Sequence, residues 1–520
     1  MTELSRRDFG TVVLKSAGGT LLASSLVPPK SNAGNRQPRR PNIVFITSDQ
    51  HTYKCTGYAG HPVVQTPNLD RIAAQGVVFE SNYCGNPVCV PSRTSMMTGM
   101  YASDCNSFCN STVWDGSHPL WGKRLKDAGY HCWATGKMDL NDKFDSGFVE
   151  VDVDHGHVKK PDITSLLRRP TIYRIGERDA VDGASRDERS DDAGKTEGAV
   201  QFIKEKSKNL KQPWVCYVGL YQPHPAFRAW KPHFDHYYPN LADVPNIPPG
   251  FLEDLHLVFQ ELRHFKRIAT PIPDERIRRC RAAYYGMITE LDEYIGRLYD
   301  ALKDSGQLEN TVFVYTSDHG ESLGEHGLWL KNNLYDMAAR VPLVMAGAGL
   351  PKARRIGTPC GHVDVAATLL DMAGVPRPPD FRGHSLLPLM LGKSGNHPGF
   401  AFSESHSEGN VTGSFLIRKG DWKYIHFHWY DDLLFNLKED PGEFNNRIDD
   451  PAAASAKTEL KSILDSLVDP EEVTVRAFRM QEEMLARFAG TMTEEELFNL
   501  FRSRLGPGQS RVMVNKLKRM

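Results

Sequence analysis

The sequence predicts an α/β fold in which a large sheet is flanked by helices and is followed by a small C-terminal antiparallel sheet subdomain with helices. Continuous apolar runs with the length of buried strands alternate with segments of helical periodicity. Polar residues follow most of these runs directly. In the C-terminal part, short strands separated by turn residues replace this pattern. The four clearest strands of the first part are 42–48, 214–220, 311–316 and 340–345.

The composition is that of an ordinary globular protein, and its charge balance excludes two classes of partner. Of the 520 residues, 40% are apolar and 24% are charged, enough for one large domain and a smaller one. Lys plus Arg number 63 and Asp plus Glu number 64, so the net charge attracts neither nucleic acid nor a membrane surface. We therefore expect local charge to hold any anionic substrate.

The cysteine pattern gives no indication of a zinc or iron–sulfur site. The nine cysteines include no Cys-x-x-Cys pair. Apart from Cys89 there are eight, an even number that permits disulfides without requiring them. Cys105 and Cys109 lie close in sequence, so they either form a disulfide or simply pack.

The N-terminus has the features of an export signal. Arg6 and Arg7 precede a weak apolar run at 11–27, which is too short and too polar to be a stable membrane anchor. Residues 1–33 resemble a twin-arginine signal peptide, although Gly10 stands where a large apolar residue is usual. The resemblance implies the twin-arginine export machinery as a partner and a periplasmic or secreted location. The alternative is a frayed basic terminus.

The first predicted strand, 42–48, delivers Asp49 and Gln50 to its carboxyl end. Ligand sites in α/β sheets collect at such ends. A helix at 66–75 and a strand at 76–80 follow, and this second strand leads towards the most informative stretch of the chain.

That stretch is the segment around Cys89, which we expect to face an anion site. Pro91 predicts a helix start, because the amide that proline lacks has no partner in a first turn. Cys89 then lies just outside the helix, where free amides and the helix dipole favour an anion, and Arg93 adds a fixed positive charge. A cysteine in such surroundings is more often a buried apolar residue than a catalyst, so its neighbours in sequence must decide.

Three further strand ends carry candidate site residues. Lys137 and Asp139 follow one strand, and His224, held between two prolines, follows the next. Asp318 and His319 follow the third, and an acid beside an imidazole after a buried strand favours a metal site. Lys331 comes shortly afterwards. The predicted helix and strand pairs are 120–128 with 131–134, 195–208 with 214–220, and 274–302 with 311–316.

The remaining segments are less regular. Residues 140–195 have many charges and weak periodicity, so we expect a surface excursion that either forms a wall of the substrate cleft or is simply solvated. Charged amphipathic helices end the chain and are expected to pack on the small sheet. We find no internal repeat. The other predicted elements are a helix at 363–372 and strands at 414–418, 422–426 and 433–436.

Two motifs identify a family resemblance. The chain reads Cys-x-Pro-Ser-Arg-x-x-x-x-Thr-Gly from Cys89 and Ser-Asp-His-Gly-Glu…Gly-Glu-His-Gly-Leu-Trp-x-Lys up to Lys331. Both resemble signatures of the type I sulfatases of the alkaline phosphatase superfamily, in which the cysteine is oxidised to formylglycine. The resemblance, over residues 41–450, implies an alkaline phosphatase-like large mixed sheet. It further implies a catalytic domain at 41–395, a C-terminal subdomain at 396–520, and a formylglycine-generating enzyme as a maturation partner.

The resemblance also implies a role for each candidate residue. Cys89, as a formylglycine hydrate, is the nucleophile that attacks a sulfate monoester, and Arg93 stabilises the hydrate. Lys137 and Lys331 hold the sulfate oxygens. His224 is the general acid for the leaving oxygen.

The implied cofactor is a divalent cation. Hard oxygen ligands favour Ca²⁺, whereas the imidazole in the set leaves Mn²⁺ open. The cation polarises a sulfate oxygen and lowers the pKa of the nucleophile. The implied ligands are Asp49, Gln50, Cys89, Asp318 and His319.

Asp139 departs from the family pattern, which usually reads Gly-Lys-Trp/Met-His. We expect it to bind Lys137 or a substrate hydroxyl, and the alternative is a weakened catalyst. Uronate 2-sulfatases that resemble arylsulfatase K share Gly-Lys-x-Asp. The implied substrate is therefore a sulfated carbohydrate, such as a 2-O-sulfated uronate at a chain end.

Three alternatives remain open. Choline-sulfatase-like enzymes share the Asp-Gln and Asp-His pairs and a Ser-Glu…Glu-Gly-x-Val element, here 403–411. Phosphonate monoester and phosphodiester hydrolases of the same superfamily share the metal ligands and can carry the same oxidised cysteine. The third alternative is a protein that binds sulfated glycans and whose Cys89 is never oxidised.

Overall fold

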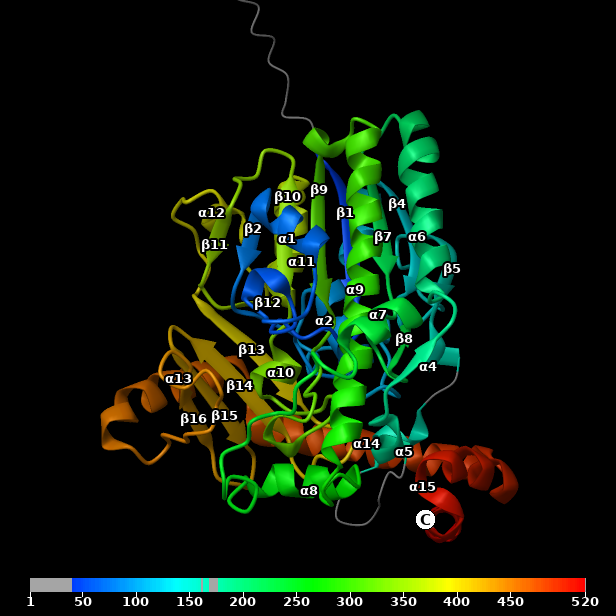
Figure 1. Ribbon diagram of the computed structural model, residues 1–520, viewed down its shortest axis with the longest axis vertical. Coiled ribbons are helices and arrows are strands. Elements are labelled where there is room, and N and C mark those ends of the chain that lie inside the picture. The colour runs from blue at the N-terminus through cyan, green and yellow to red at the C-terminus, as the bar shows by residue number, and fades with distance from the viewer. Residues whose placement is uncertain (1–39, 160–161, 168–175, 520) are drawn as a thin grey trace, which may run out of the picture. The chain divides into compact units, whose positions relative to one another are not determined.

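A large mixed sheet forms the centre of the fold. The computed structural model describes residues 40–159, 162–167 and 176–519. Within these residues the sheet has eight strands, of which β10 is antiparallel to both neighbours while the other pairs are parallel (Figure 1). In sheet order they are β11 (Arg354–Ile356), β2 (Gly76–Phe79), β10 (Leu343–Gly347), β9 (Thr311–Ser317), β1 (Asn42–Ser48), β7 (Trp214–Gly219), β4 (His131–Lys137) and β5 (Val149–Asp154).

Helices cover both faces of this sheet. The central strands are therefore buried on both sides, which fits their continuous apolar runs. The helices α1 (Pro67–Ala74), α6 (Asp192–Gln201) and α9 (Asp274–Asp304) pack on one face. The opposite face is covered by α2 (Cys89–Thr98), α3 (Trp121–Asp127) and α11 (His362–Met372). In Figure 1, α9 runs along the front of the sheet.

Shorter elements connect these layers. Two pairs of short parallel strands are β3 (Asn82–Tyr83) with β12 (Cys360–Gly361) and β6 (Ala184–Arg186) with β8 (Arg228–Trp230). The remaining short helices are α4 (Gly156–Lys159), α5 (Gly176–Ala180), α7 (Lys231–Tyr237), α8 (Leu257–Phe265), α10 (Asp336–Ala339) and α12 (Leu387–Met390).

The α/β fold class and the mixed sheet are confirmed, but the prediction for 140–195 was partly wrong. Residues 149–154 are not a surface excursion; they form β5, the edge strand beside β4. Valine alternates with acidic residues in this strand, and most of its side chains are exposed. An exposed edge strand lacks the continuous apolar run of a buried parallel strand, so the pattern sought in the sequence could not reveal it.

The small C-terminal sheet is confirmed and has one strand more than predicted. Its antiparallel order is β13-β14-β15-β16. β13 follows a Pro- and Gly-rich stretch and includes Ser403 and Glu404, polar residues that concealed it. The strands are β13 (Phe400–Ser405), β14 (Ser414–Lys419), β15 (Trp422–Phe427) and β16 (Leu433–Asn436).

The C-terminal helices pack in two places. α13 (Ala454–Leu467) and the first turns of α14 (Pro470–Thr491) share an apolar cluster with the small sheet, as expected. α15 (Glu494–Leu517) instead packs against 163–167 and Phe265, so the prediction that the whole tail packs on the sheet was wrong. The charged surface of α15 gave no sign of this partner.

The structure leaves the predicted signal and the domain boundary untested, and it settles the pairing of the cysteines. Residues 1–33, the predicted signal, lie outside the described residues, and the boundary between 395 and 396 stays a prediction. None of the helices that the structure describes is long and apolar enough to cross a membrane. All nine cysteines are described, and all are buried and free, so Cys105 and Cys109 pack rather than pair.

A buried ionic network ties the small sheet to α10 and β3. Lys423 on β15 has no exposed side-chain surface, and its Nζ lies 2.9 Å from Asp336 Oδ1 and 2.6 Å from Glu443 Oε1. The Tyr83 hydroxyl donates to the same Asp336 oxygen at 2.8 Å. Burial alone would raise the pKa of Asp336, but the charge of Lys423 outweighs it and holds this pKa well below its usual range.

We expect Lys423→Ala to lower the free energy of unfolding by about 3–5 kcal/mol, because it leaves two carboxylates buried without their cation. The shift of the thermal unfolding midpoint measures this loss. Lys419→Ala on the neighbouring strand is the matched control. Lys419 pairs with Glu459 in a largely exposed ion pair, so its removal should cost at most about 1 kcal/mol. Equal midpoints for the two variants would contradict the structural role of Lys423.

Candidate active site

The predicted site residues converge at the carboxyl ends of β1 and β9 and at the first turn of α2. β1 and β9 are adjacent parallel strands, so the residues that follow them lie side by side, and the backbone N–H of Gln50 donates to Asp318 Oδ1 at 3.1 Å. α2 begins at Cys89 itself, which corrects the prediction that Pro91 starts the helix. None of the first-turn amides has an intrahelical partner, so proline fits the third position as well as the first.

Cys89 is fully buried at the centre of this cluster. Lys331 Nζ donates to Cys89 Sγ at 2.8 Å, and His319 Nε2 lies 3.3 Å from the same sulfur. The two carboxylate oxygens of Asp49 lie 3.7 and 3.8 Å from it. If Cys89 were oxidised, its sulfur would mark the position of the formylglycine oxygens. Cys89 and the Asp49 carboxylate are thus in contact.

Four buried side chains offer ligand atoms that all lie within 4.8 Å of one another, close enough to share one metal ion. They are Asp49, Cys89, Asp318 and His319.

Gln50, the fifth predicted ligand, presents a fitting donor. Its Nε2 donates to Glu321, while its Oε1 is buried and has no hydrogen-bond partner among the described residues. The Tyr284 hydroxyl donates a hydrogen bond to the backbone carbonyl of Gln50 at 2.7 Å. Its φ of 73° is one that few residues other than glycine adopt, so the fold holds Gln50 in an unfavourable backbone conformation. Carboxylates together with an unpaired amide oxygen fit a hard divalent cation.

Arg93 links the ligands to the strand end that carries Lys137. Its Nε donates to Asp318 Oδ2 at 2.9 Å, and its Nη1 donates to the Lys137 carbonyl at 2.9 Å. Its Nη2 lies 3.9 Å from Asp49 Oδ2 and has no hydrogen-bond partner among the described residues. The guanidinium, which is fully buried, therefore orients Asp318 directly.

Asp139 contacts Lys137, as one of the two sequence interpretations expects. Lys137 Nζ lies 2.5 Å from Asp49 Oδ2 and 3.2 Å from Asp139 Oδ2. The His157 ring donates from Nδ1 to the same Asp139 oxygen at 2.8 Å. Asp139 thus holds the ammonium of Lys137 on one side and an imidazole on the other.

His224 completes the set of predicted residues. Its Nδ1 donates to the Pro225 carbonyl at 2.6 Å, which leaves Nε2 as the edge that faces the cluster, 3.4 Å from Lys331 Nζ. Lys331 therefore lies between Cys89 and His224. The structure brings every predicted site residue into one contiguous cluster.

The charges of this cluster favour an anion at position 89. Burial and the charge of Asp49 would raise the pKa of Cys89, but Lys137, Lys331 and His319 outweigh them and hold it well below its ordinary value. Burial would also raise the pKa of Asp49, and the neighbouring cations again more than offset it. A negatively charged substrate group would meet the same field.

Sequence reasoning missed several residues that position the site. Glu321 and Asn110 are the clearest, since Asn110 Oδ1 accepts from the Val90 amide at the start of α2 at 3.1 Å. Glu408, from the C-terminal part, accepts from Asn110 and from Asn332, the residue after Lys331. Glu321 lies inside the quoted Ser-Asp-His-Gly-Glu motif and could have been found there. Nothing in the local pattern marked Asn110.

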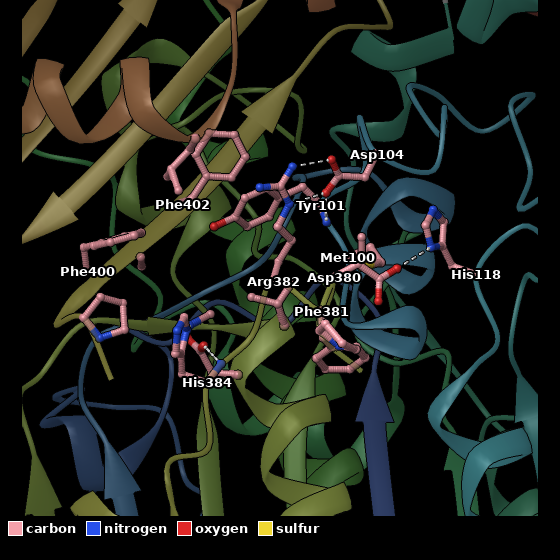
Figure 2. A pocket seen from close by; sticks show the side chains of 17 residues that line it. Met100, Tyr101, Asp104, His118, Asp380, Phe381, Arg382, His384, Phe400 and Phe402 are labelled. Atoms are coloured by element: carbon pink, nitrogen blue, oxygen red, sulfur yellow. Dashed lines mark hydrogen bonds and ion pairs between the residues drawn. The ribbon is translucent and has the colours of Figure 1, made fainter. Parts of the chain in front are cut away.

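A cavity of about 610 Å³ lies apart from this cluster, near the end of α2, α11 and β13. Figure 2 shows its aromatic residues Tyr101 and Phe402 and the Arg382–Asp104 pair. None of the predicted site residues lines it. Arg382 makes two hydrogen bonds to Asp104, at 2.8 and 2.7 Å, so its charge is already neutralised. This cavity is therefore not the candidate active site.

Comparisons with known proteins cover most of the chain. A family model described as Sulfatase matches residues 41–375, and one described as N-sulphoglucosamine sulphohydrolase, C-terminal, matches residues 324–469. Arylsulfatase K of Danio rerio is 31% identical over 469 residues, which cover 85% of this chain and 87% of that protein. Choline-sulfatase of Rhizobium meliloti (strain 1021) is 29% identical, covering 82% of this chain and 86% of that protein.

A solved structure has the same fold. The phosphonate monoester hydrolase of Agrobacterium radiobacter aligns with a TM-score of 0.69 and 25% identity, over 82% of this chain and 95% of that one. The similarity thus extends through both the large sheet and the C-terminal part.

Proposed function

Because the chain belongs to the sulfatase family and is a sulfuric ester hydrolase, we propose that it cleaves a sulfate monoester of a carbohydrate with formylglycine at position 89 and a divalent cation. The observation that carries this proposal is the contact of Cys89 with Lys331, His319 and the carboxylate of Asp49. A buried cysteine that only packs would not sit among three ionisable groups.

Formylglycine fits the surroundings of Cys89. A formylglycine-generating enzyme would exchange the sulfur and two hydrogens of the side chain for one oxygen, with an external oxidant taking up the electrons. The hydrated aldehyde supplies one hydroxyl to attack sulfur and a second whose deprotonation releases sulfate. Arg93, whose Nη2 is unpaired among the described residues, is the proposed partner of the hydrate.

The chain's own residues bind the ester and move its protons. Lys137 and Lys331 are the proposed ligands of two sulfate oxygens, and both are nearly buried, which strengthens their interaction with an anion. His224 is the proposed general acid for the leaving oxygen: its Nδ1–H is fixed by a backbone carbonyl, and in the doubly protonated ring Nε2, the edge that faces Lys331, carries the proton to be donated.

The proposed cation is Ca²⁺. Asp49, Gln50 and Asp318 offer hard oxygen donors, and His319 and the modified residue 89 complete the set. When bound, the cation polarises a sulfate oxygen. Glu321 orients the Gln50 amide so that its oxygen, not its nitrogen, is left for the metal.

The proposed substrate is a sulfated carbohydrate, with a 2-O-sulfated uronate as the finer proposal. The name of the Danio rerio relative supports a sulfatase, and the carbohydrate proposal rests on Asp139, which distinguishes the site from the usual Gly-Lys-x-His motif. We also keep the proposals of twin-arginine export, a periplasmic or secreted location, and a catalytic domain at 41–395 with a subdomain at 396–520.

A sulfate ester fits better than the phosphonate monoester of the rival proposal. A sulfate ester carries three unbridged oxygens, and the site offers three positive groups to bind them, namely Lys137, Lys331 and the cation. A phosphonate monoester carries two such oxygens and an organic substituent that a positive group does not stabilise.

We therefore expect the matured enzyme to hydrolyse 4-nitrophenyl sulfate with a kcat/KM at least about tenfold higher than that for 4-nitrophenyl phenylphosphonate. The transition state of the phosphonate would make one charge-assisted hydrogen bond fewer, and the loss of such a bond accounts for that factor. Release of 4-nitrophenol measures both reactions. A higher kcat/KM for the phosphonate would favour the rival. Choline sulfate, assayed by sulfate release, tests the choline-sulfatase alternative. An unmodified Cys89 in protein from its native host, together with no turnover, would favour the glycan-binding alternative.

A further inference from the structure

His157 lies beside the sulfate-binding residues, yet the reaction just described leaves it without a role. It follows β5, whose register with β4 sets Lys137 opposite Asp154. The Met138 and Asp139 amides both donate to the Asp154 carbonyl, at 3.0 and 3.2 Å. These bonds lock the ends of the two strands together and bring α4, the short helix that carries His157, next to Asp139.

Two hydrogen bonds fix the orientation of His157. Its backbone amide donates to Asp139 Oδ1 at 3.2 Å, and its ring donates from Nδ1 to Asp139 Oδ2 at 2.8 Å. The ring Nε2 has no hydrogen-bond partner in the part of the chain that the structure describes. The His157 side chain is 23% exposed, whereas Lys137 and Asp139 are 5% and 1% exposed. Of these three side chains, the imidazole is therefore the one that solvent reaches.

We propose that His157 binds a second anionic group of the substrate, the carboxylate of a sulfated uronate, while Lys137 holds the sulfate. This inference rests on the proposed function. Lys137 Nζ and His157 Nδ1 contact the same carboxylate oxygen of Asp139, at 3.2 and 2.8 Å, so these two nitrogens are no farther apart than the two distances combined. A 2-O-sulfated uronate carries its carboxylate across the ring from the sulfate ester, at a separation of similar size.

The charges around the imidazole suit this role. Burial would lower the pKa of His157, but the charge and hydrogen bond of Asp139 outweigh burial and raise it above the ordinary value. The other charged groups that face the ring are Lys137, which lowers the pKa, and Cys89, which raises it. A cationic imidazole can donate a charge-assisted hydrogen bond to a carboxylate, whereas a hydroxymethyl group in the same place binds much less strongly.

The test uses the matured, cation-loaded enzyme and two substrates that differ only at this group. These are the methyl glycoside of glucuronate 2-sulfate and that of glucose 2-sulfate. We expect the wild type to prefer the uronate in kcat/KM, and His157→Gln to reduce that preference roughly 10- to 100-fold, mainly through KM. His155→Gln is the matched control: His155 is buried on Glu150 and Leu140, so the preference should persist.

A pH series on the wild type gives a second measurement that does not depend on the folding of a variant. The preference should hold at pH values below the raised pKa of His157 and fall as the pH rises through it. An equal loss on both substrates, a preference that survives His157→Gln, or no preference in the wild type would each overturn the inference. Absence of turnover on both glycosides and on 4-nitrophenyl sulfate would instead refute the proposed function.

Discussion

Cys89→Ala is expected to lower kcat for sulfate ester hydrolysis by roughly 10⁴- to 10⁶-fold, the loss typical of removing a covalent nucleophile. Alanine cannot be oxidised to formylglycine, so neither the attacking hydroxyl nor the one that releases sulfate can form. The fold should survive, because the substitution removes a single sulfur from a cluster that its neighbours continue to fill. Turnover of 4-nitrophenyl sulfate and the thermal unfolding midpoint together measure the effect.

Cys105→Ala is the matched control. Cys105 is also buried and lies after the same helix, where its sulfur contacts the Thr98 hydroxyl at 3.6 Å. We expect its substitution to leave kcat unchanged. Mass analysis of the tryptic peptide that contains position 89 should find formylglycine in the control and in the wild type. Appreciable activity in Cys89→Ala would mean that another group is the nucleophile.

The convergence of the site could be predicted because it follows from strand direction. Asp49 and Asp318 follow buried apolar runs, and the carboxyl ends of adjacent parallel strands meet at one edge. The sequence could therefore place both residues near Cys89 before their contacts were known. Their roles in catalysis stay predictions, because geometry brings residues together without assigning the chemistry that each performs.

What the sequence could not predict depends on contacts between segments without periodicity. Asp139 was recognised as a departure from the family motif, but its partner His157 is positioned by the pairing of β4 with the exposed strand β5. Likewise, the orientation of the Gln50 amide depends on Glu321, which is 271 residues away. Such pairs depend on tertiary structure, and one sequence carries no signal for them.

The same reasoning explains why the charge of the site was only partly predictable. The sequence indicated local cations for an anionic substrate, and Lys137 and Lys331 are confirmed at the cluster. The contribution of the C-terminal part to the surroundings of these lysines was not predictable. Glu408 accepts a hydrogen bond from Asn332, the residue after Lys331, although Glu408 belongs to a segment that local motifs assign to a separate subdomain.

Removal of the divalent cation is expected to abolish turnover reversibly and to destabilise the fold. Asp49 and Asp318 are both fully buried beside Cys89, and without a cation their repulsion is balanced by Arg93, His319 and the neighbouring lysines. A ligand that binds only the folded state at a hundred times its Kd adds about 2.7 kcal/mol of stability. Ca²⁺ should therefore raise the unfolding midpoint of chelator-treated enzyme and restore hydrolysis of 4-nitrophenyl sulfate.

The Asp318→Asn variant distinguishes the stability gained by binding Ca²⁺ from the stability of the fold without metal. The substitution keeps the shape of the side chain but removes one charge from the ligand set, so the increase in midpoint with Ca²⁺ should largely disappear. Asp292→Asn is the matched control, since Asp292 is as deeply buried but accepts hydrogen bonds from the first amides of α1. That variant should lose stability while retaining its full response to Ca²⁺. Wild-type enzyme that contains no metal by elemental analysis and keeps its activity after prolonged chelation would refute the ligand set.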